Sequence, residues 1–134
     1  MKIEEVEGIG ATFAAKLQEV GINTTDDMLM AGATAASRDK VAEMTGISGK
    51  LILEWTNHVD LMRIDGVGSE YSDLLEAAGV DSPAELAQRN AKNLAQTFAE
   101  LDAARPNTVR RVPSEEVVEG WIAQAKTLPK MVRH

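Results

Sequence analysis

The sequence contains no cysteine among its 134 residues. This absence excludes disulfide bonds, thiol nucleophiles and metal sites built on cysteine. Histidine is almost as scarce, because His58 and the terminal His134 are the only two and their spacing matches no metal-binding motif. We therefore expect no metal centre and no cofactor.

Long apolar runs are also missing. No stretch approaches the roughly 20 consecutive apolar residues that a membrane-spanning helix needs. The opening residues MKIEEVEG carry three glutamates and lack the apolar core of a signal peptide. We expect a cytoplasmic protein with no membrane association.

Basic residues are fewer than acidic ones: the chain contains 14 Lys and Arg and 21 Asp and Glu, which gives a net charge of −7. A general nucleic-acid coat needs an excess of cations to displace counterions, so the composition argues against one. Residues 1–60 alone hold ten acids and five bases. Many of the basic residues come late in the chain, at Arg105, Arg110, Arg111, Lys126, Lys130 and Arg133. A local basic site is therefore expected only near the end.

What the chain does contain is an internal repeat. The stretch VEGIGATFAAKLQEVGI (6–22) returns as IDGVGSEYSDLLEAAGV (64–80), at an offset of 58 residues. Farther on, Trp55 pairs with Trp121 at an offset of 66, so the second copy carries an insertion of eight residues, expected near 102–113. We predict a first repeat over 1–60 and a second over 61–134.

Both copies show helical periodicity and helix-boundary signals. Apolar residues recur at i, i+4 and i+7 after each glycine pair, and Gly21 and Gly79 are typical helix stops. Thr24–Asp27 and Ser82–Glu85 have the spacing of reciprocal helix caps. Helices are expected over 25–31, near 37–45 and from Ser48 onward, with both tryptophans and the six methionines as core residues. No strand is predicted.

Each copy begins with a glycine hairpin, Gly-aliphatic-Gly, which leads into an amphipathic helix. The first glycine can take a positive φ at the turn. We expect the second to let two helix backbones approach closely. The unpaired N–H groups and positive dipole of the new helix would face an anion, which makes the hairpin a physical phosphate site.

These two stretches resemble the helix-hairpin-helix family, whose hairpin amides typically hold nucleic-acid phosphates, sometimes with a monovalent cation on hairpin carbonyls. TGISGKLILEW (45–55) and RRVPSEEVVEGWIAQAKTLP (110–129) extend the similarity to a bacterial family of unknown function with two such repeats. The resemblance implies an all-α fold of two fused helix-hairpin-helix-like (SAM-like) repeats, each of about five short helices, packed as one compact unit.

The residues around the hairpins depart from the phosphate-binding pattern, which usually places Lys or Arg just after the second glycine. The first hairpin remains a phosphate candidate, and its residues are Gly8, Ile9, Gly10, Ala11, Thr12 and Lys16. The second is interpreted as structural, because Glu70 stands where phosphate would bind; it comprises Gly66, Val67 and Gly68. Arg110 and Arg111, in the insertion, are a further candidate anion site, with surface ion pairing as the alternative.

No catalytic constellation is recognisable, since the chain offers no Ser–His–Asp order, paired buried carboxylates or phosphate-binding loop. We expect a non-enzymatic binding module that recognises a protein partner through acidic helical surfaces. The alternative is backbone binding to DNA or RNA, without sequence readout, through the first hairpin and the Arg110–Arg111 loop. The partner's identity and the oligomeric state are left open.

Overall fold

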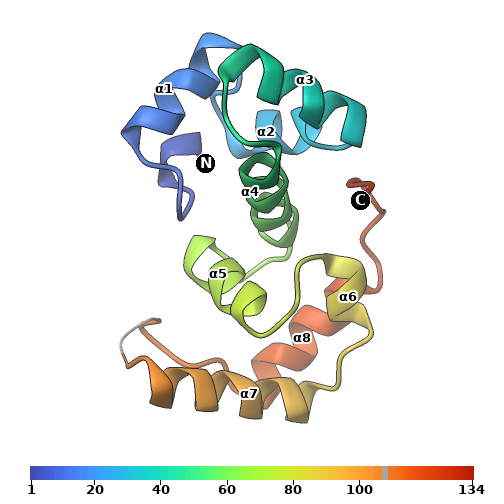
Figure 1. Ribbon diagram of the computed structural model, residues 1–134. Coiled ribbons are helices and arrows are strands. Elements are labelled where there is room, and N and C mark those ends of the chain that lie inside the picture. Colours follow the sequence, from blue (N-terminus) through green and yellow to red (C-terminus); the bar gives the residue numbers. More distant parts are fainter. Residues whose placement is uncertain (107–108) are drawn as a thin grey trace. The chain divides into compact units, whose positions relative to one another are not determined.

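The computed structural model describes residues 1–106 and 109–134, and the regular secondary structure of these residues is helical (Figure 1). A 3₁₀ helix, η1 (Ile3–Glu5), precedes eight α-helices. Their bounds are α1 (Ala11–Glu19), α2 (Thr25–Ala31), α3 (Ala35–Thr45), α4 (Gly49–Leu61), α5 (Ser69–Ala77), α6 (Pro83–Ala87), α7 (Ala91–Ala104) and α8 (Glu115–Ala125). The described part forms no β-sheet, and its single bridge joins Lys2 to Thr24.

The chain divides into two compact units. The first comprises residues 1–60 with 130–134, and the second comprises residues 61–129. The first holds η1 and α1–α4, whereas the described part of the second holds α5–α8, one fewer than the expected number of about five. The C-terminal residues 130–134 were expected to belong to the second repeat, but their contacts group them with the first unit. The expected packing of the two repeats together stays a prediction.

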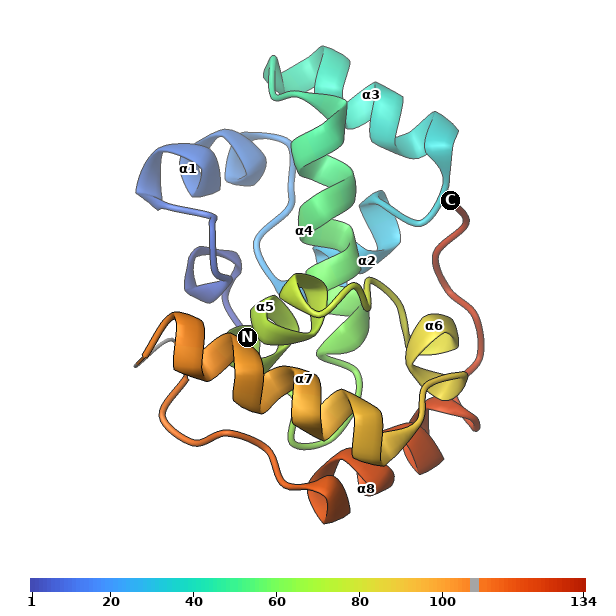
Figure 2. The same cartoon turned by 60° about the horizontal axis from the view of Figure 1, so that its bottom comes forward.

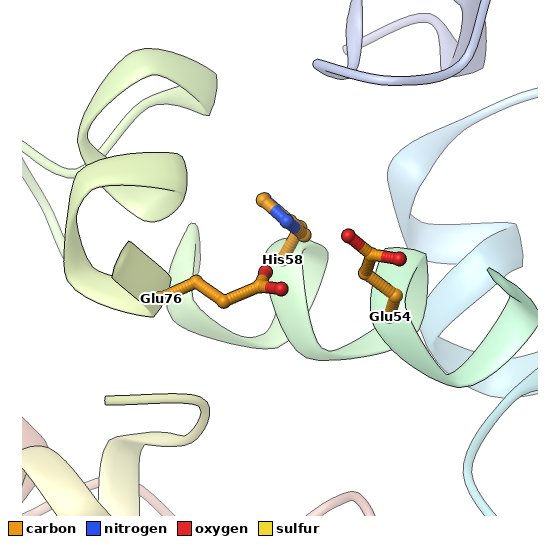
Figure 3. A group of neighbouring side chains, drawn as sticks. All are labelled: Glu54, His58 and Glu76. Carbon is orange, nitrogen blue, oxygen red and sulfur yellow. The ribbon is translucent and has the colours of Figure 1, made fainter. Parts of the chain in front are cut away.

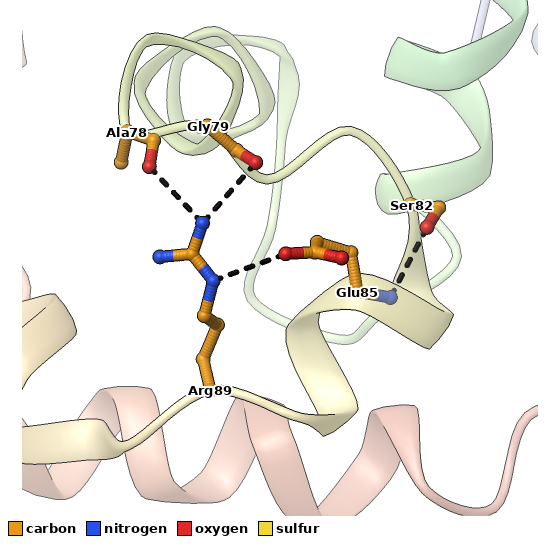
Figure 4. A network of polar contacts seen from close by, with 5 residues as sticks. All are labelled: Ala78, Gly79, Ser82, Glu85 and Arg89. Carbon is orange, nitrogen blue, oxygen red and sulfur yellow. Dashed lines mark hydrogen bonds and ion pairs between the residues drawn. The ribbon is translucent and has the colours of Figure 1, made fainter.

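The two predicted helix caps form to different extents. The Thr24 hydroxyl accepts the Asp27 N–H at 3.1 Å, and the Asp27 carboxylate accepts the Thr24 N–H at 3.1 Å, so this box is complete. At α6 the Ser82 hydroxyl accepts the Glu85 N–H, but the Glu85 carboxylate instead pairs with Arg89 at 3.2 Å (Figure 4). The longer glutamate side chain is held by its cationic neighbour one helical turn away.

Both predicted glycine stops are present, with φ of +86° at Gly21 and +87° at Gly79. In each case the two N–H groups after the helix bond back to its last turn, as in a Schellman motif. Ile22 donates to the Leu17 carbonyl at 3.0 Å, and Val80 donates to the Leu75 carbonyl at 2.8 Å. The local turn thus recurs at the predicted offset.

The second stop has an additional restraint, shown in Figure 4. The Arg89 guanidinium donates to the carbonyl oxygens of Ala78 and Gly79 at 3.4 and 3.2 Å while its Nε holds Glu85. A cation at the C-terminal end of α5 also interacts favourably with the helix dipole. This arginine therefore fixes the α5–α6 connection of the second unit.

The insertion is larger than the predicted eight residues and is offset by a deletion. The caps Asn90 and Ser114 are 24 positions apart, whereas Thr34 and Ser48 are 14 apart, so this segment gains ten residues. The preceding cap-to-cap interval is shortened by two, from ten to eight. Part of the gain lengthens a helix, since α7 has 14 residues and α3 has 11.

Each unit buries one of the two tryptophans, as predicted. In the second unit α8 packs against α6 and α7 (Figure 2), and Trp121 joins Phe98 and the aliphatic residues of these helices in one core. The prediction for the methionines is wrong for four of the six. Met28 is fully buried, but Met1, Met30, Met44 and Met131 are exposed.

Candidate functional site

The first glycine hairpin joins η1 to α1. Val6 and Ile9 are buried on either side of the turn, and the Ile9 N–H donates to the Val6 carbonyl at 3.0 Å. Gly8, between them, has φ of +87°, a conformation that only glycine adopts without strain. The apolar pair anchors the turn, and Gly8 permits its reversal.

The inner side of this hairpin is occupied by an aromatic pair. A Cβ added at Gly8 would lie 3.6 Å from Nε1 of Trp55, and the Trp55 ring packs against Phe13 with centroids 5.1 Å apart. Tilted aromatic pairs at this separation are stabilising beyond the area that they bury. The indole of α4 therefore packs against the hairpin backbone and holds the start of α1.

The second hairpin has the same construction. Gly66 has φ of +91°, a Cβ there would lie 3.2 Å from Nε1 of Trp121, and Tyr71 pairs with this ring at 5.3 Å. One contact was not foreseen from the sequence. The Gln124 side-chain amide accepts the Asp65 N–H at 2.9 Å and donates to the Asp65 carbonyl at 3.2 Å. The first glycine of each hairpin is thus accounted for by backbone conformation and tryptophan packing.

The expected reason for the second glycine is wrong. Gly10 and Gly68 have φ of −82° and −92°, and a Cβ at either position would meet nothing within 4 Å. Neither residue therefore provides a close approach between helices. Both are N-cap residues that lack a side-chain acceptor, so they leave the first N–H groups of α1 and α5 without a side-chain cap.

The surface of the first hairpin is negatively charged. Ala11 and Thr12, in the first turn of α1, are exposed, as are Glu4, Glu5 and Glu7 just before it. Lys16 is exposed too, but it lies in the last turn of α1, at the opposite end from the hairpin amides. Since α1 rises about 1.5 Å per residue, Lys16 is displaced along the axis from the site it was expected to complete.

At the second hairpin the start of α5 is in contact with the inserted loop. The Glu70 carboxylate accepts the backbone N–H of Arg110, and the Tyr71 hydroxyl donates to the Arg111 carbonyl at 2.7 Å. The inserted loop is therefore attached to the start of α5 through its backbone. The side chains of Arg110 and Arg111 are exposed. That Glu70 prevents phosphate binding at this hairpin stays a prediction.

Two further features were not foreseen as sites. Glu54 and His58 lie one turn apart on α4 in the first unit, as Figure 3 shows; Glu76, drawn with them, belongs to α5 of the second unit. Two side chains from one helix leave a tetrahedral metal site half filled. This pair by itself is not a metal centre.

The second unit also contains a hollow of about 520 Å³ between α5 and the end of α7. It is lined by Asp73, Leu74, Ala77, Leu101, Ala104 and Arg105. Its volume lies in the range of small-molecule pockets. These six residues include no nucleophile paired with a base.

The complete cap at the start of α2 affects the pKa of the Asp27 carboxylate. The N–H groups of Asn23 and Thr24 both donate to the Asp27 carboxylate, at 3.0 and 3.1 Å, and these bonds lower the pKa of Asp27 below its ordinary value. The shift therefore follows from helix capping.

A family model described as "Domain of unknown function (DUF4332)" matches residues 7–128. The chain belongs to this family. The match includes both glycine hairpins and the Arg110–Arg111 loop, whereas residues 130–134 lie outside it. No curated protein and no solved structure gives a significant match. None of the helices in the described part of the chain has both the length and the apolar character needed to span a membrane.

Proposed function

We propose that this chain is a non-enzymatic binding module that docks a protein partner on an acidic surface of its first unit. In this proposal both units are helix-hairpin-helix-like (SAM-like) repeats whose hairpins are used chiefly as helix connectors. The recurrence of a positive-φ glycine against a tryptophan, followed by a Schellman turn, supports the repeat assignment.

The observation that carries the proposal is the group of exposed carboxylates beside the first hairpin, Glu4, Glu5 and Glu7, here named the η1 acidic surface. Three acids within four positions repel a phosphate backbone and attract a basic protein surface. Charges interact over about 8–10 Å at ordinary ionic strength, which is enough to include the start of α1. Electrostatic complementarity of this kind steers association and selects partners.

The experiment is affinity capture with the immobilised full chain and its charge variants. The triple variant Glu4→Gln/Glu5→Gln/Glu7→Gln removes the charge of the η1 acidic surface and keeps its hydrogen-bond acceptors. A matched control neutralises three exposed acids of α8: Glu115→Gln/Glu116→Gln/Glu119→Gln. The wild-type chain and the α8 control should both retain the same partner protein, and the η1 variant should not retain it. Equal retention by all three chains would contradict the proposal.

A second function is favoured by one specific observation. The open space at Gly10 and the uncapped, exposed first turn of α1 leave amide groups that could hold a nucleic-acid phosphate. In this alternative Thr12 and the hairpin amides contact the backbone, and Arg110 with Arg111 adds cationic contacts. The η1 acidic surface opposes it, which is why we rank it second.

Titration with single- and double-stranded nucleic acid at low and moderate salt separates the two functions. Backbone binding predicts an affinity that falls steeply with salt and is weakened by Arg110→Ala/Arg111→Ala. The η1 charge variant should then bind nucleic acid more tightly than wild type. Absence of binding at low salt would remove this alternative.

A further inference from the structure

The last five residues return to the first unit as a tail without helical structure, here named the C-terminal tail (130–134). The Arg133 N–H donates to the Ala33 carbonyl at 2.8 Å, in the α2–α3 turn. The His134 ring nitrogen Nε2 lies 2.8 Å from Oδ1 of Asn57 on α4. Both drawn views place the chain end beside this part of the first unit (Figures 1 and 2).

The tail is seated by one apolar side chain. Val132 is only 2% exposed, whereas its neighbour Met131 is 41% exposed and Lys130 and Arg133 also face solvent. One buried aliphatic anchor, a backbone hydrogen bond and outward-facing neighbours are the features with which an extended peptide binds a protein surface. The contacts that hold the tail at Ala33 and Asn57, here named the seat, therefore resemble those of a bound extended peptide.

We propose that this seat is a second interaction surface of the first unit, with the C-terminal tail as its resident occupant. Its external ligand is an extended protein segment with the same chemistry: an aliphatic anchor flanked by basic residues. The net charge of the first unit supports this choice, because residues 1–60 hold ten acids and five bases while the tail contributes Lys130 and Arg133. Beside Ala33 the buried Arg38 guanidinium donates to the Gly32 carbonyl at 2.7 Å, so this cation already has a partner. The proposal does not depend on the η1 acidic surface.

The tail is attached to the same chain, so it competes with any external segment at a high effective concentration. Short tethers give effective concentrations of the order of millimolar. The Pro129 carbonyl, just before the tail, accepts a hydrogen bond from the Arg63 guanidinium at 2.7 Å. An external segment should therefore bind strongly only when the tail is released.

The test uses a labelled synthetic peptide of residues 129–134 and the full chain, with fluorescence anisotropy as the readout. Val132→Ser removes the anchor from the chain's own tail and leaves the seat intact. This variant should bind the peptide at least about tenfold more tightly than wild type, because the tethered competitor is lost. A peptide carrying serine in place of the valine should not bind.

Met131→Ser is the matched control, since it changes an exposed neighbour and should exclude the peptide as wild type does. Equal peptide binding by wild type and Val132→Ser, or no binding by a folded Val132→Ser chain, would overturn the proposal. If that variant does not fold, hydrogen exchange of wild type decides. The Arg133 amide should exchange through local opening, faster than the central amides of α4. Exchange as slow as theirs would show a permanent core element and also overturn the proposal.

Discussion

The two glycines of each hairpin should respond differently to alanine. Gly8 and Gly66 have φ of +87° and +91°, in the region that side chains rarely adopt, whereas Gly10 and Gly68 have negative φ. Replacing each of the four glycines by alanine therefore shows which positions need glycine for its backbone conformation and which are glycine only as part of the motif.

The magnitudes follow from the local geometry. An L-residue in the left-handed region costs roughly 1–2 kcal/mol. At Gly8 the new Cβ would lie at an ordinary 3.6 Å from Trp55, so Gly8→Ala should lower the free energy of unfolding by about 1–2 kcal/mol. At Gly66 it would lie at 3.2 Å from Trp121 and displace the ring slightly, which raises the expected loss to about 2–3 kcal/mol.

At Gly10 and Gly68 two small effects oppose each other. Alanine is a poorer N-cap than glycine, but it also reduces the conformational entropy of the unfolded chain. We expect changes within about 1 kcal/mol of zero at both positions. Any loss of ligand binding in Gly10→Ala would then report on the site and not on the fold.

The assay is urea unfolding followed by far-UV circular dichroism for wild type and the four single variants. Tryptophan fluorescence is a second probe, because Trp55 and Trp121 each contact one hairpin. The reasoning is refuted if Gly10→Ala and Gly68→Ala cost as much as Gly8→Ala and Gly66→Ala. It is also refuted if all four variants are as stable as wild type.

Two further predictions concern other parts of the first unit. A Cβ at Gly32 would lie 2.0 Å from Oγ1 of Thr56, so Gly32→Ala should destabilise the chain by about 2–3 kcal/mol in the same urea assay. The control Gly120→Ala, in an exposed part of a helix, should stabilise the chain by about 0.5–1 kcal/mol. An equal effect of the two substitutions would contradict the close approach of Gly32 to Thr56. Because the folded-state pKa of Asp27 is lowered, its contribution to stability is present above the unfolded pKa and is lost as pH falls through the folded one. The stability difference between wild type and Asp27→Asn should therefore shrink in urea titrations from neutral pH to below pH 4, and a constant difference would count against the cap.

Local patterns in the sequence were sufficient for much of the fold. Helix caps and stops depend on residues within one turn, so Thr24, Gly21 and Gly79 could be interpreted without knowing any distant contact. The offset between the copies likewise placed Trp55 and Trp121 in equivalent positions. The family match agrees with the expected membership of a family of unknown function.

Features that depend on distant contacts could not be predicted in this way. The side-chain contact of Gln124 with Asp65 and the seating of Val132 join residues far apart in the sequence. The exposed methionines belong here too, because hydrophobic character alone does not decide which face of a short helix is covered.

The sequence by itself determined an all-helical chain with a duplicated Gly-aliphatic-Gly hairpin, because helix periodicity, caps and stops are local properties. The sequence also placed the first glycine of each pair at a turn with positive φ, which the structure confirms. Only the tertiary structure showed that this turn packs against a tryptophan from a distant helix and that the second glycine has open space around it. It also decided that the Glu70 carboxylate accepts the backbone N–H of Arg110, since that contact spans 40 residues of sequence.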